Sequence, residues 1–231
     1  SLVMTACEQT EYWKVIITAS ELLYPNLKGK LKHVGFGMVN LTSGKMASRT
    51  GNIIDAFSLF EQVKAAIKEE FKSQEQLAEK IAVAAIKYSF LKNEVSKNIT
   101  FDLKTSIAKE GDSGPYLLYT YTRIFSLLNK LPTATQTTAA VDQQPTAEER
   151  ELLQRISQFP EIVNKTLKIL SPHLLINYLY KLAREYNNFY QTFPILKAEK
   201  NKELKLLITR LTGQIVKDGL NLLGIETVEK M

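Results

Sequence analysis

The residues with the clearest chemical potential lie in one short segment, Gly44-Lys45-Met46-Ala47-Ser48-Arg49-Thr50-Gly51-Asn52. Glycines let a backbone approach phosphate groups closely, and Lys and Arg side chains meet their negative charge. This composition is typical of a loop that closes over a nucleotide. The segment is not a P-loop, because the Gly-x-x-x-x-Gly-Lys-Ser/Thr spacing is missing. Taken alone, the segment is more simply interpreted as a solvated basic turn.

Other kinds of catalytic site have little support in the sequence. The two histidines, His33 and His173, lie far apart, and Cys7 is the single cysteine. No zinc-ligand spacing can be built from these residues. The lone thiol has no histidine near it in the sequence. We therefore expect neither a metal centre nor a cysteine-dependent enzyme.

The elements that must position the loop are a strand before it and a helix after it. The segment from His33 to Val39 is short, apolar and rich in β-branched or aromatic residues, which predicts a buried strand. Further upstream, a helix is predicted from Glu8 to about Asn26, because apolar residues recur there at spacings of three and four: Tyr12, Trp13, Ile16, Ala19, Leu22 and Leu23. Tyr24-Pro25-Asn26 would end that helix.

From Ile53 onward the chain is predicted to be almost wholly helical. Helical spacing covers Asp55–Glu70 and Gln74–Leu91, and Ser73 with Gln76 predicts a capping box. The segment from Leu131 to Gln144 has almost no charge and little apolar bulk, so it is expected to be a loop or mobile linker.

After the linker the pattern predicts a helical bundle. Thr146 with Glu149 predicts a capping box that restarts a helix. Ser171-Pro172 places a cap residue before a Pro at the first helical position. The last helix is expected from Glu203 through Leu223, ended by Gly224. The helix after Pro172 is expected to bury one stripe: Leu174, Leu175, Tyr178, Leu179, Leu182 and Tyr186.

In combination, these segments resemble arginyl-tRNA synthetases, members of class I of the aminoacyl-tRNA synthetases. The loop is similar to the KMSKS signature of that class in its Lys-Met-Ser-Ser/Thr-Arg variant, with Ala47 where the family usually has Ser. Further similar segments follow in the family's order: His33–Val39, Ala85–Leu91, Phe101-Asp102, Glu110–Ile124 and Gly219–Met231.

The resemblance implies a mainly α-helical chain. The end of a class I Rossmann-type catalytic domain, with one or two strands and the KMSKS-like loop, would precede an α-helical anticodon-binding bundle. The implied divisions are residues 1–55 as the remnant of the nucleotide-binding domain, 56–130 as a helical connection and the start of the anticodon-binding domain, 131–145 as a flexible linker or loop, and 146–231 as the bundle.

The resemblance also implies ATP, with magnesium, as the cofactor. Lys45 and Arg49 would meet the phosphates and Ser48 would donate a hydroxyl, which makes these three the candidate catalytic residues. Negative charge moves toward the departing pyrophosphate, so cations placed there stabilise the transition state more than the ground state. The remaining candidate nucleotide-binding residues are His33, Val34, Gly35, Phe36, Gly37, Met38 and Met46, together with Lys45.

Gln9 aligns with a family glutamine that contacts the substrate arginine. An exposed polar residue at a helix start is an equally good interpretation of Gln9. The implied partner of the bundle is arginine-specific tRNA, whose splayed anticodon bases would be read by stacking and by edge hydrogen bonds. By family position, Tyr190 and Met231 would form the platform for an anticodon base. Pro194 stands where the family has an aromatic residue.

Several residues near that platform remain open to two interpretations. Tyr186 and Phe189 could add aromatic surface, but bundle core is the simpler interpretation. Arg123 could bind RNA or brace helices. A set of lysines could lie along the tRNA backbone or simply form a solvated helix face: Lys197, Lys200, Lys202 and Lys205.

The implied parent enzyme is an arginine–tRNA ligase, which activates arginine with ATP and transfers it to tRNA. Class I enzymes also need a His-x-Gly-His element, which this sequence lacks. The chain alone is therefore expected to bind tRNA without catalysing the reaction. The alternative is a non-catalytic RNA-binding or interaction module of synthetase ancestry.

Composition is that of an ordinary globular protein. The chain has 231 residues, 45% of them hydrophobic and 23% charged, with a net charge of +6 that permits an anionic partner without requiring one. No apolar run approaches the roughly 18–20 residues that cross a bilayer. The start carries no signal-peptide pattern, and it has Ser1 where a natural start has Met. These features predict a soluble cytoplasmic protein cut from something longer.

Overall fold

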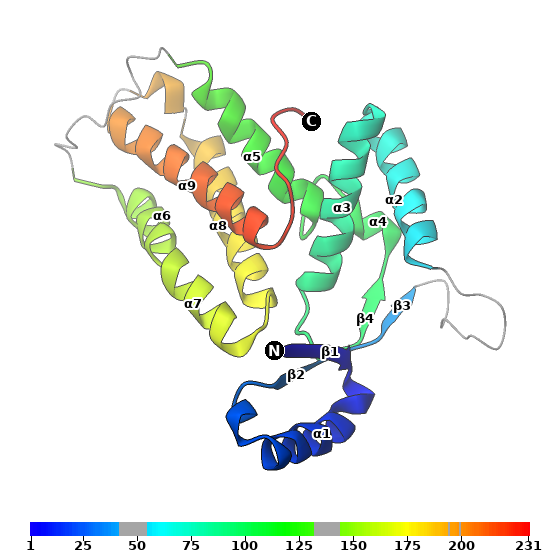
Figure 1. The fold of residues 1–231 in the computed structure, drawn as a ribbon. Coiled ribbons are helices and arrows are strands. Elements are labelled where there is room, and N and C mark those ends of the chain that lie inside the picture. The colour runs from blue at the N-terminus through cyan, green and yellow to red at the C-terminus, as the bar shows by residue number, and fades with distance from the viewer. Residues whose placement is uncertain (42–54, 132–143, 194, 199) are drawn as a thin grey trace.

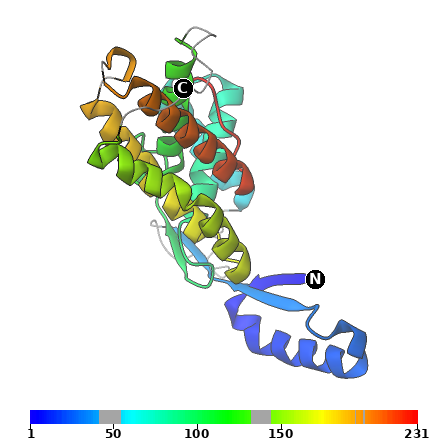
Figure 2. The same cartoon turned by 90° about the vertical axis from the view of Figure 1, so that its left-hand side faces the viewer.

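The computed structural model describes residues 1–41, 55–131, 144–193, 195–198 and 200–231 (Figure 1). In these ranges the chain is mainly helical with a few short strands, so the predicted fold class is confirmed. A small unit built on two strands projects from one end of a larger helical body, as Figure 2 shows.

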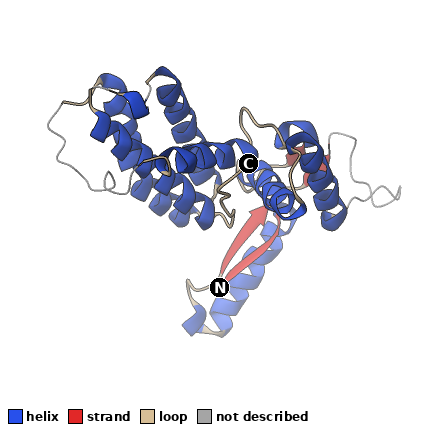
Figure 3. Cartoon of the chain, turned by 90° about the horizontal axis from the view of Figure 1, so that it is seen from above, coloured by secondary structure: helices blue, strands red, loops and turns tan. Residues whose placement is uncertain are grey.

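The projecting unit is a two-stranded parallel sheet with one helix against it. Strand β1 (Leu2–Ala6) leads through a 3₁₀ turn (Cys7–Gln9) into α1 (Thr10–Leu23), and a second 3₁₀ turn (Pro25–Leu27) leads to β2 (Lys32–Phe36). The register pairs Leu2 with Lys32 and Ala6 with Phe36. Figure 3 shows α1 running alongside both strands. The predicted helix and its end at Tyr24-Pro25 are confirmed, whereas β1 had not been predicted.

Helix α1 covers one face of this sheet. His33 pairs with Val3 and Thr5 lies two residues further along the same strand, so Thr5 and His33 share one face of the sheet, the face that meets α1. Oγ1 of Thr5 lies 2.8 Å from Nε2 of His33, and the ring of Trp13 in α1 stacks on the His33 ring with centroids 6.2 Å apart.

The predicted strand over His33–Val39 is in fact two strands, β2 and β3 (Val39–Leu41), and it is not buried. Of residues 32–40, only Gly37 is buried, while Phe36 and Met38 are 42% and 51% exposed. The break occurs because the chain leaves β1 after Phe36 and pairs instead with β4 (Ile99–Phe101), in parallel. At Gly37 a Cβ would lie 2.0 Å from the Lys97 carbonyl oxygen, so glycine permits this crossing.

The helical body begins with the pair α2 (Ala56–Phe71) and α3 (Glu75–Leu91). Asp55 caps α2 by accepting a 2.9 Å hydrogen bond from the Ser58 backbone N–H. The predicted capping box of Ser73 and Gln76 is wrong. Helix α3 begins one residue later than that box requires, with Gln74 as its N-cap, and its N-cap makes no side-chain hydrogen bond.

The remaining elements complete the bundle. They are α4 (Leu103–Ser106), α5 (Gly114–Leu128), α6 (Ala147–Ser157), α7 (Phe159–Ile169), α8 (His173–Thr192), a 3₁₀ turn (Ile195–Lys197) and α9 (Lys202–Leu222). The capping box of Thr146 and Glu149 is confirmed. Ser171 is not the cap of α8, because Pro172 takes that position and the Ser171 hydroxyl pairs with Nδ1 of His173 at 2.7 Å.

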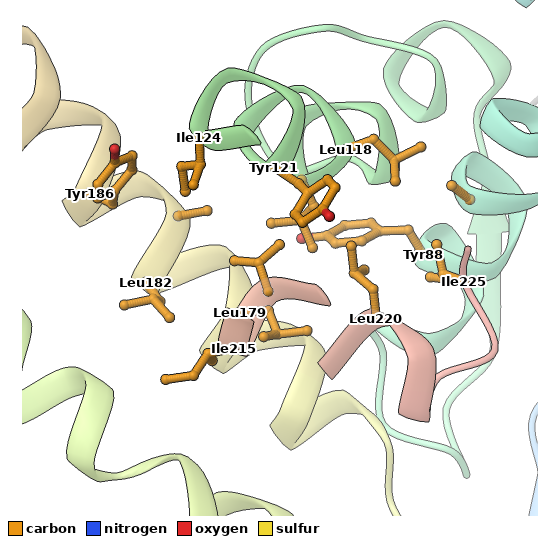
Figure 4. Close-up of a cluster of buried hydrophobic side chains, with 14 of the residues drawn as sticks. Tyr88, Leu118, Tyr121, Ile124, Leu179, Leu182, Tyr186, Ile215, Leu220 and Ile225 are labelled. Carbon is orange, nitrogen blue, oxygen red and sulfur yellow. The ribbon is translucent and has the colours of Figure 1, made fainter. Parts of the chain in front are cut away.

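One continuous core joins α3 to the bundle (Figure 4). Tyr88 of α3, Leu118 of α5, Leu179 of α8 and Leu220 of α9 are all fully buried in it. The stripe predicted for α8 is confirmed except at Leu174, which is only partly buried. Because α5 and α8 pack through this core, side chains on their outer faces are held in fixed relative positions.

Candidate functional site

The strand segment predicted to contact a nucleotide divides into two parts. At Gly37 and Met38 the backbone already bonds the segment 95–99: Gly37 N–H donates to the Val95 carbonyl (2.9 Å), and the Met38 carbonyl accepts from Ile99 N–H (2.8 Å). In β2, residues 32–36 pair with β1 on one edge, and within the described ranges no strand pairs with the other edge. Free backbone groups on that edge could bond an adenine ring.

Gln9 lies at the edge of the sheet where a ligand would be expected. It is the last residue of the 3₁₀ turn that follows β1, is exposed, and directly precedes the first residue of α1. Strands β1 and β2 are parallel, so Ala6 and Phe36 mark the same carboxyl edge. Ligands of open α/β sheets bind beyond this edge. The loop residues Lys45, Met46, Ser48 and Arg49 lie outside the described residues.

An apolar hollow of about 380 Å³ lies between β2 and the helical body. Val34 and Phe36 line it from the sheet, Phe90 from α3, and Leu170 and Pro172 from the turn before α8. None of its lining residues carries a charge. It is therefore unsuited to a triphosphate, and we assign it no role in nucleotide binding.

A second group of functional side chains lies where α5 passes α8. Arg123 of α5 is held between two tyrosines, with its guanidinium carbon 4.7 Å from the Tyr119 ring centroid and 5.3 Å from that of Tyr190. Its Nη1 donates to Oδ1 of Asn187 and its Nη2 donates to the Tyr119 hydroxyl, both at 3.0 Å. Arg123 therefore braces α5 against α8 and fixes the Tyr190 ring.

These side chains border a hollow of about 200 Å³, which we call the Tyr190 hollow. Its lining combines aromatic surface with positive charge, and consists of Tyr119, Thr122, Arg123, Ser126, Leu127, Lys130, Tyr190 and Leu196. An aromatic face beside cations is the combination that binds an unstacked base and its phosphate. Tyr190 is partly buried, so its ring is fixed and still reachable.

The neighbouring aromatic residues belong to the core instead. Tyr186 is fully buried and Phe189 nearly so, and burial raises the pKa of the Tyr186 hydroxyl above its ordinary value. Asn187 is buried with its amide donating to the Tyr116 hydroxyl (2.9 Å) and to Oγ1 of Thr120 (2.8 Å). The sequence analysis missed Asn187 and Tyr119. The i, i+3 spacing of Asn187 with Tyr190, and the i, i+4 spacing of Tyr119 with Arg123, were the available signals.

The C-terminal segment lies against the same part of α5. Thr122, which precedes Arg123 in the sequence, donates a 2.9 Å hydrogen bond from its Oγ1 to the Val228 carbonyl. Met231 is partly buried against the hydrophobic core. Tyr190 thus contacts Arg123, and the segment that ends at Met231 is bonded at Val228 to the neighbouring residue Thr122.

The predicted set of backbone-binding lysines is wrong in one member. Lys205 is buried, and its Nζ lies 2.9 Å from Oε1 of the fully buried Glu149. It faces the interior because α9 packs there against α6. Lys200 and Lys202 are exposed.

Another hollow, of about 340 Å³, lies between α6 and α8 and is lined by Glu148, Glu151 and Glu185. Its negative charge disfavours RNA, although Arg155 forms a bidentate pair with Glu185. The Tyr190 hollow is therefore the better candidate for a nucleic acid. In the described part of the chain, no three His, Cys, Asp or Glu side chains come together to hold a metal ion. The helices described there include none of the length and apolarity that crossing a membrane requires.

Comparison with known proteins gives consistent results. A family model for the DALR anticodon binding domain matches residues 117–231. The arginine–tRNA ligase of Parabacteroides distasonis is 37% identical over 97% of this chain and 40% of its own length. That of Flavobacterium psychrophilum is 33% identical over 97% of this chain and 39% of its own length. The solved Thermus thermophilus arginyl-tRNA synthetase superposes with a TM-score of 0.86 at 28% identity, over 100% of this chain and 41% of its own. The chain thus spans about 40% of the length of these curated relatives.

Proposed function

Because the chain belongs to the arginyl-tRNA synthetase family, as a C-terminal portion of such a protein, we propose that it binds arginine-specific tRNA through the anticodon. The observation that carries the proposal is the Tyr190 hollow, where one aromatic ring is fixed by Arg123 beside a further cation, Lys130. Stacking on Tyr190 supplies affinity for an unstacked base, and Met231 completes the platform.

For the whole protein, the proposed activity is ATP-dependent activation of arginine and its transfer to tRNA, in the cytoplasm where tRNA is used. In that reaction Lys45, Ser48 and Arg49 stabilise the charge that develops on the triphosphate. The free edge of β2 and residue Met46 hold the nucleotide, and Gln9 contacts arginine. Magnesium accompanies the nucleotide. The present chain lacks a His-x-Gly-His element, so alone it binds tRNA and does not form the adenylate.

We expect Tyr190→Ala to weaken binding of arginine-specific tRNA by roughly 5- to 150-fold, because stacking of one base on an aromatic ring contributes about 1–3 kcal/mol. Tyr190→Phe keeps the ring and should bind within about twofold of the unsubstituted chain. Filter binding of the two variants at one salt concentration makes the comparison.

The matched control is Tyr24→Ala. It removes an aromatic ring that is 60% exposed, at the end of α1 in the projecting unit. If Tyr190→Ala binds as tightly as Tyr24→Ala while both remain folded, Tyr190 is not a stacking platform and the proposed anticodon site is wrong.

A further inference from the structure

The last eight residues, Gly224–Met231, form an extended segment that crosses two helices, and we call it the C-terminal strap. It begins where α9 ends, since Gly224 adopts a positive φ of 67° that stops the helix. Figure 1 shows the strap (red) running between α5 and α3. It ends at Met231, the residue proposed for the anticodon platform.

Specific contacts attach the strap to α3. Nζ of Lys87 donates a hydrogen bond to the Gly224 carbonyl, and Lys80, two turns earlier on the same helix, forms an ion pair with Glu226. Ile225 between them is 1% exposed and points into the core near Tyr88 (Figure 4). The root of the strap is therefore held by one buried apolar anchor and two lysines.

The other end of the strap is attached to α5. Val228 is buried, and its carbonyl accepts the hydrogen bond from Thr122 described above. Three residues of extended chain span at most about 10 Å. Met231 is consequently confined to the surroundings of Thr122 and Arg123, and Arg123 in turn contacts Tyr190.

We propose that Lys87 is a positioning residue for tRNA recognition: by holding the Gly224 carbonyl it fixes the strap, and the strap delivers Met231 to the platform beside Tyr190. This inference rests on the proposed function, because it concerns the same anticodon platform. Lys87 acts through the strap and does not touch the RNA. Its contribution to affinity therefore exists only while Met231 is present.

The test compares four variants of the full chain in filter binding with arginine-specific tRNA and with the same tRNA carrying a changed anticodon. Lys87→Met removes the ammonium but keeps a side chain of similar length, and Lys87→Arg keeps a donor.

We expect Lys87→Met to weaken binding of the arginine-specific tRNA by roughly tenfold, as for loss of a charge-assisted hydrogen bond. The ratio of the affinities for the two tRNAs should fall by the same factor. Lys87→Arg should stay near the original values. Lys97→Met is the charge-matched control, because it removes an exposed lysine whose one ion pair within the described ranges is with its neighbour Glu94. The fourth variant, Thr122→Val, detaches the other end of the strap and should act in the same direction.

The decisive comparison uses a chain that ends at Lys230. In that background Lys87→Met should cause no additional loss, because two changes that act through one contact are not additive. Urea unfolding of each variant separates a loss of binding from a loss of folding.

Three results would overturn the inference. A Lys87→Met effect that persists without Met231 would mean that the ammonium contacts RNA directly. Suppose that Lys87→Met and Thr122→Val both keep full discrimination between the two tRNAs, while removal of Met231 abolishes it. That result would refute the inference and leave the proposed function intact. Unchanged discrimination after removal of Met231 and in Tyr190→Ala would refute both.

Discussion

Replacing Lys205 with methionine is expected to lower the free energy of unfolding by about 3–5 kcal/mol, the usual effect of leaving one partner of a buried ion pair alone. Glu149 is fully buried and Lys205 is 8% exposed. Oε2 of Glu149 accepts from Thr146 N–H (2.9 Å) and Asn201 Nδ2 (2.8 Å). Within the described ranges Oε1 has the Lys205 ammonium as its one partner. Urea unfolding followed by far-UV circular dichroism measures the loss.

A second variant separates the charge from the packing. Glu149→Gln in the Lys205→Met background removes the stranded charge and keeps an acceptor for the Thr146 backbone, so it should recover at least half of the lost stability. If the double variant is no more stable than Lys205→Met alone, the unpaired charge is not the cause of the loss.

The pH dependence of this pair has a definite sign. Burial alone would raise the pKa of Glu149, but hydrogen bonds from Thr146, Lys205 and Asn201 outweigh it and hold that pKa below its ordinary value of 4.5. The pair's stabilisation is therefore complete above this value and is lost as the pH falls through the lower pKa of the folded state. In Lys205→Met the ammonium is gone, so burial favours the protonated carboxyl of Glu149. The difference in free energy of unfolding between this variant and the unsubstituted chain should therefore narrow as the pH falls. A gap that widens below pH 4.5 would contradict this assignment.

Gly114→Ala is expected to cost about 3 kcal/mol or more, at the upper end of the range for overpacked sites. Gly114 begins α5 where that helix touches α3, and a Cβ there would lie 2.3 Å from the Ala84 carbonyl oxygen and 2.6 Å from its carbon. Backbone cannot move aside as a side chain can. The two helices would have to separate, and the core they share would open.

Gly219→Ala is the matched control, because the three atoms nearest to the new Cβ would all be side-chain atoms of Leu179, the nearest at 2.6 Å, in a helical position. Its cost should be below about 1.5 kcal/mol, since Leu179 can shift its methyl groups and alanine favours the helix. Equal losses in the two variants would show that the α3–α5 contact is not specially close. Thermal or urea unfolding of both gives the comparison.

The long helices were predictable from the sequence because their information is local. Helix α9 shows its periodicity within one stretch and ends at Gly224, and the Thr146–Glu149 capping box marks the start of α6. Strand β1 was missed because its pairing partner, β2, is separated from it in the sequence by the whole of α1. Strand propensity over five residues is a weak signal without that partner.

The candidate site was predictable only in part, because several of its contacts join residues that are far apart in the sequence. Family resemblance pointed to Tyr190 and Met231, but it left Arg123 open between RNA and helix bracing. Contacts with Tyr119 and Asn187, one of them on another helix, decide for bracing. Lys205 resembles its exposed neighbours in sequence, and only the distant Glu149 explains its burial. The predicted roles of the loop residues Lys45–Arg49 remain predictions.

The measurement that tests the central claim most directly is filter binding of this chain to arginine-specific tRNA and to an anticodon-swapped control, across a series of salt concentrations. The account predicts that the arginine-specific tRNA binds more tightly at every salt concentration, and that both affinities fall with salt as phosphate contacts are screened. Equal binding of the two RNAs, or no binding of either, would contradict the claim that this chain reads an anticodon.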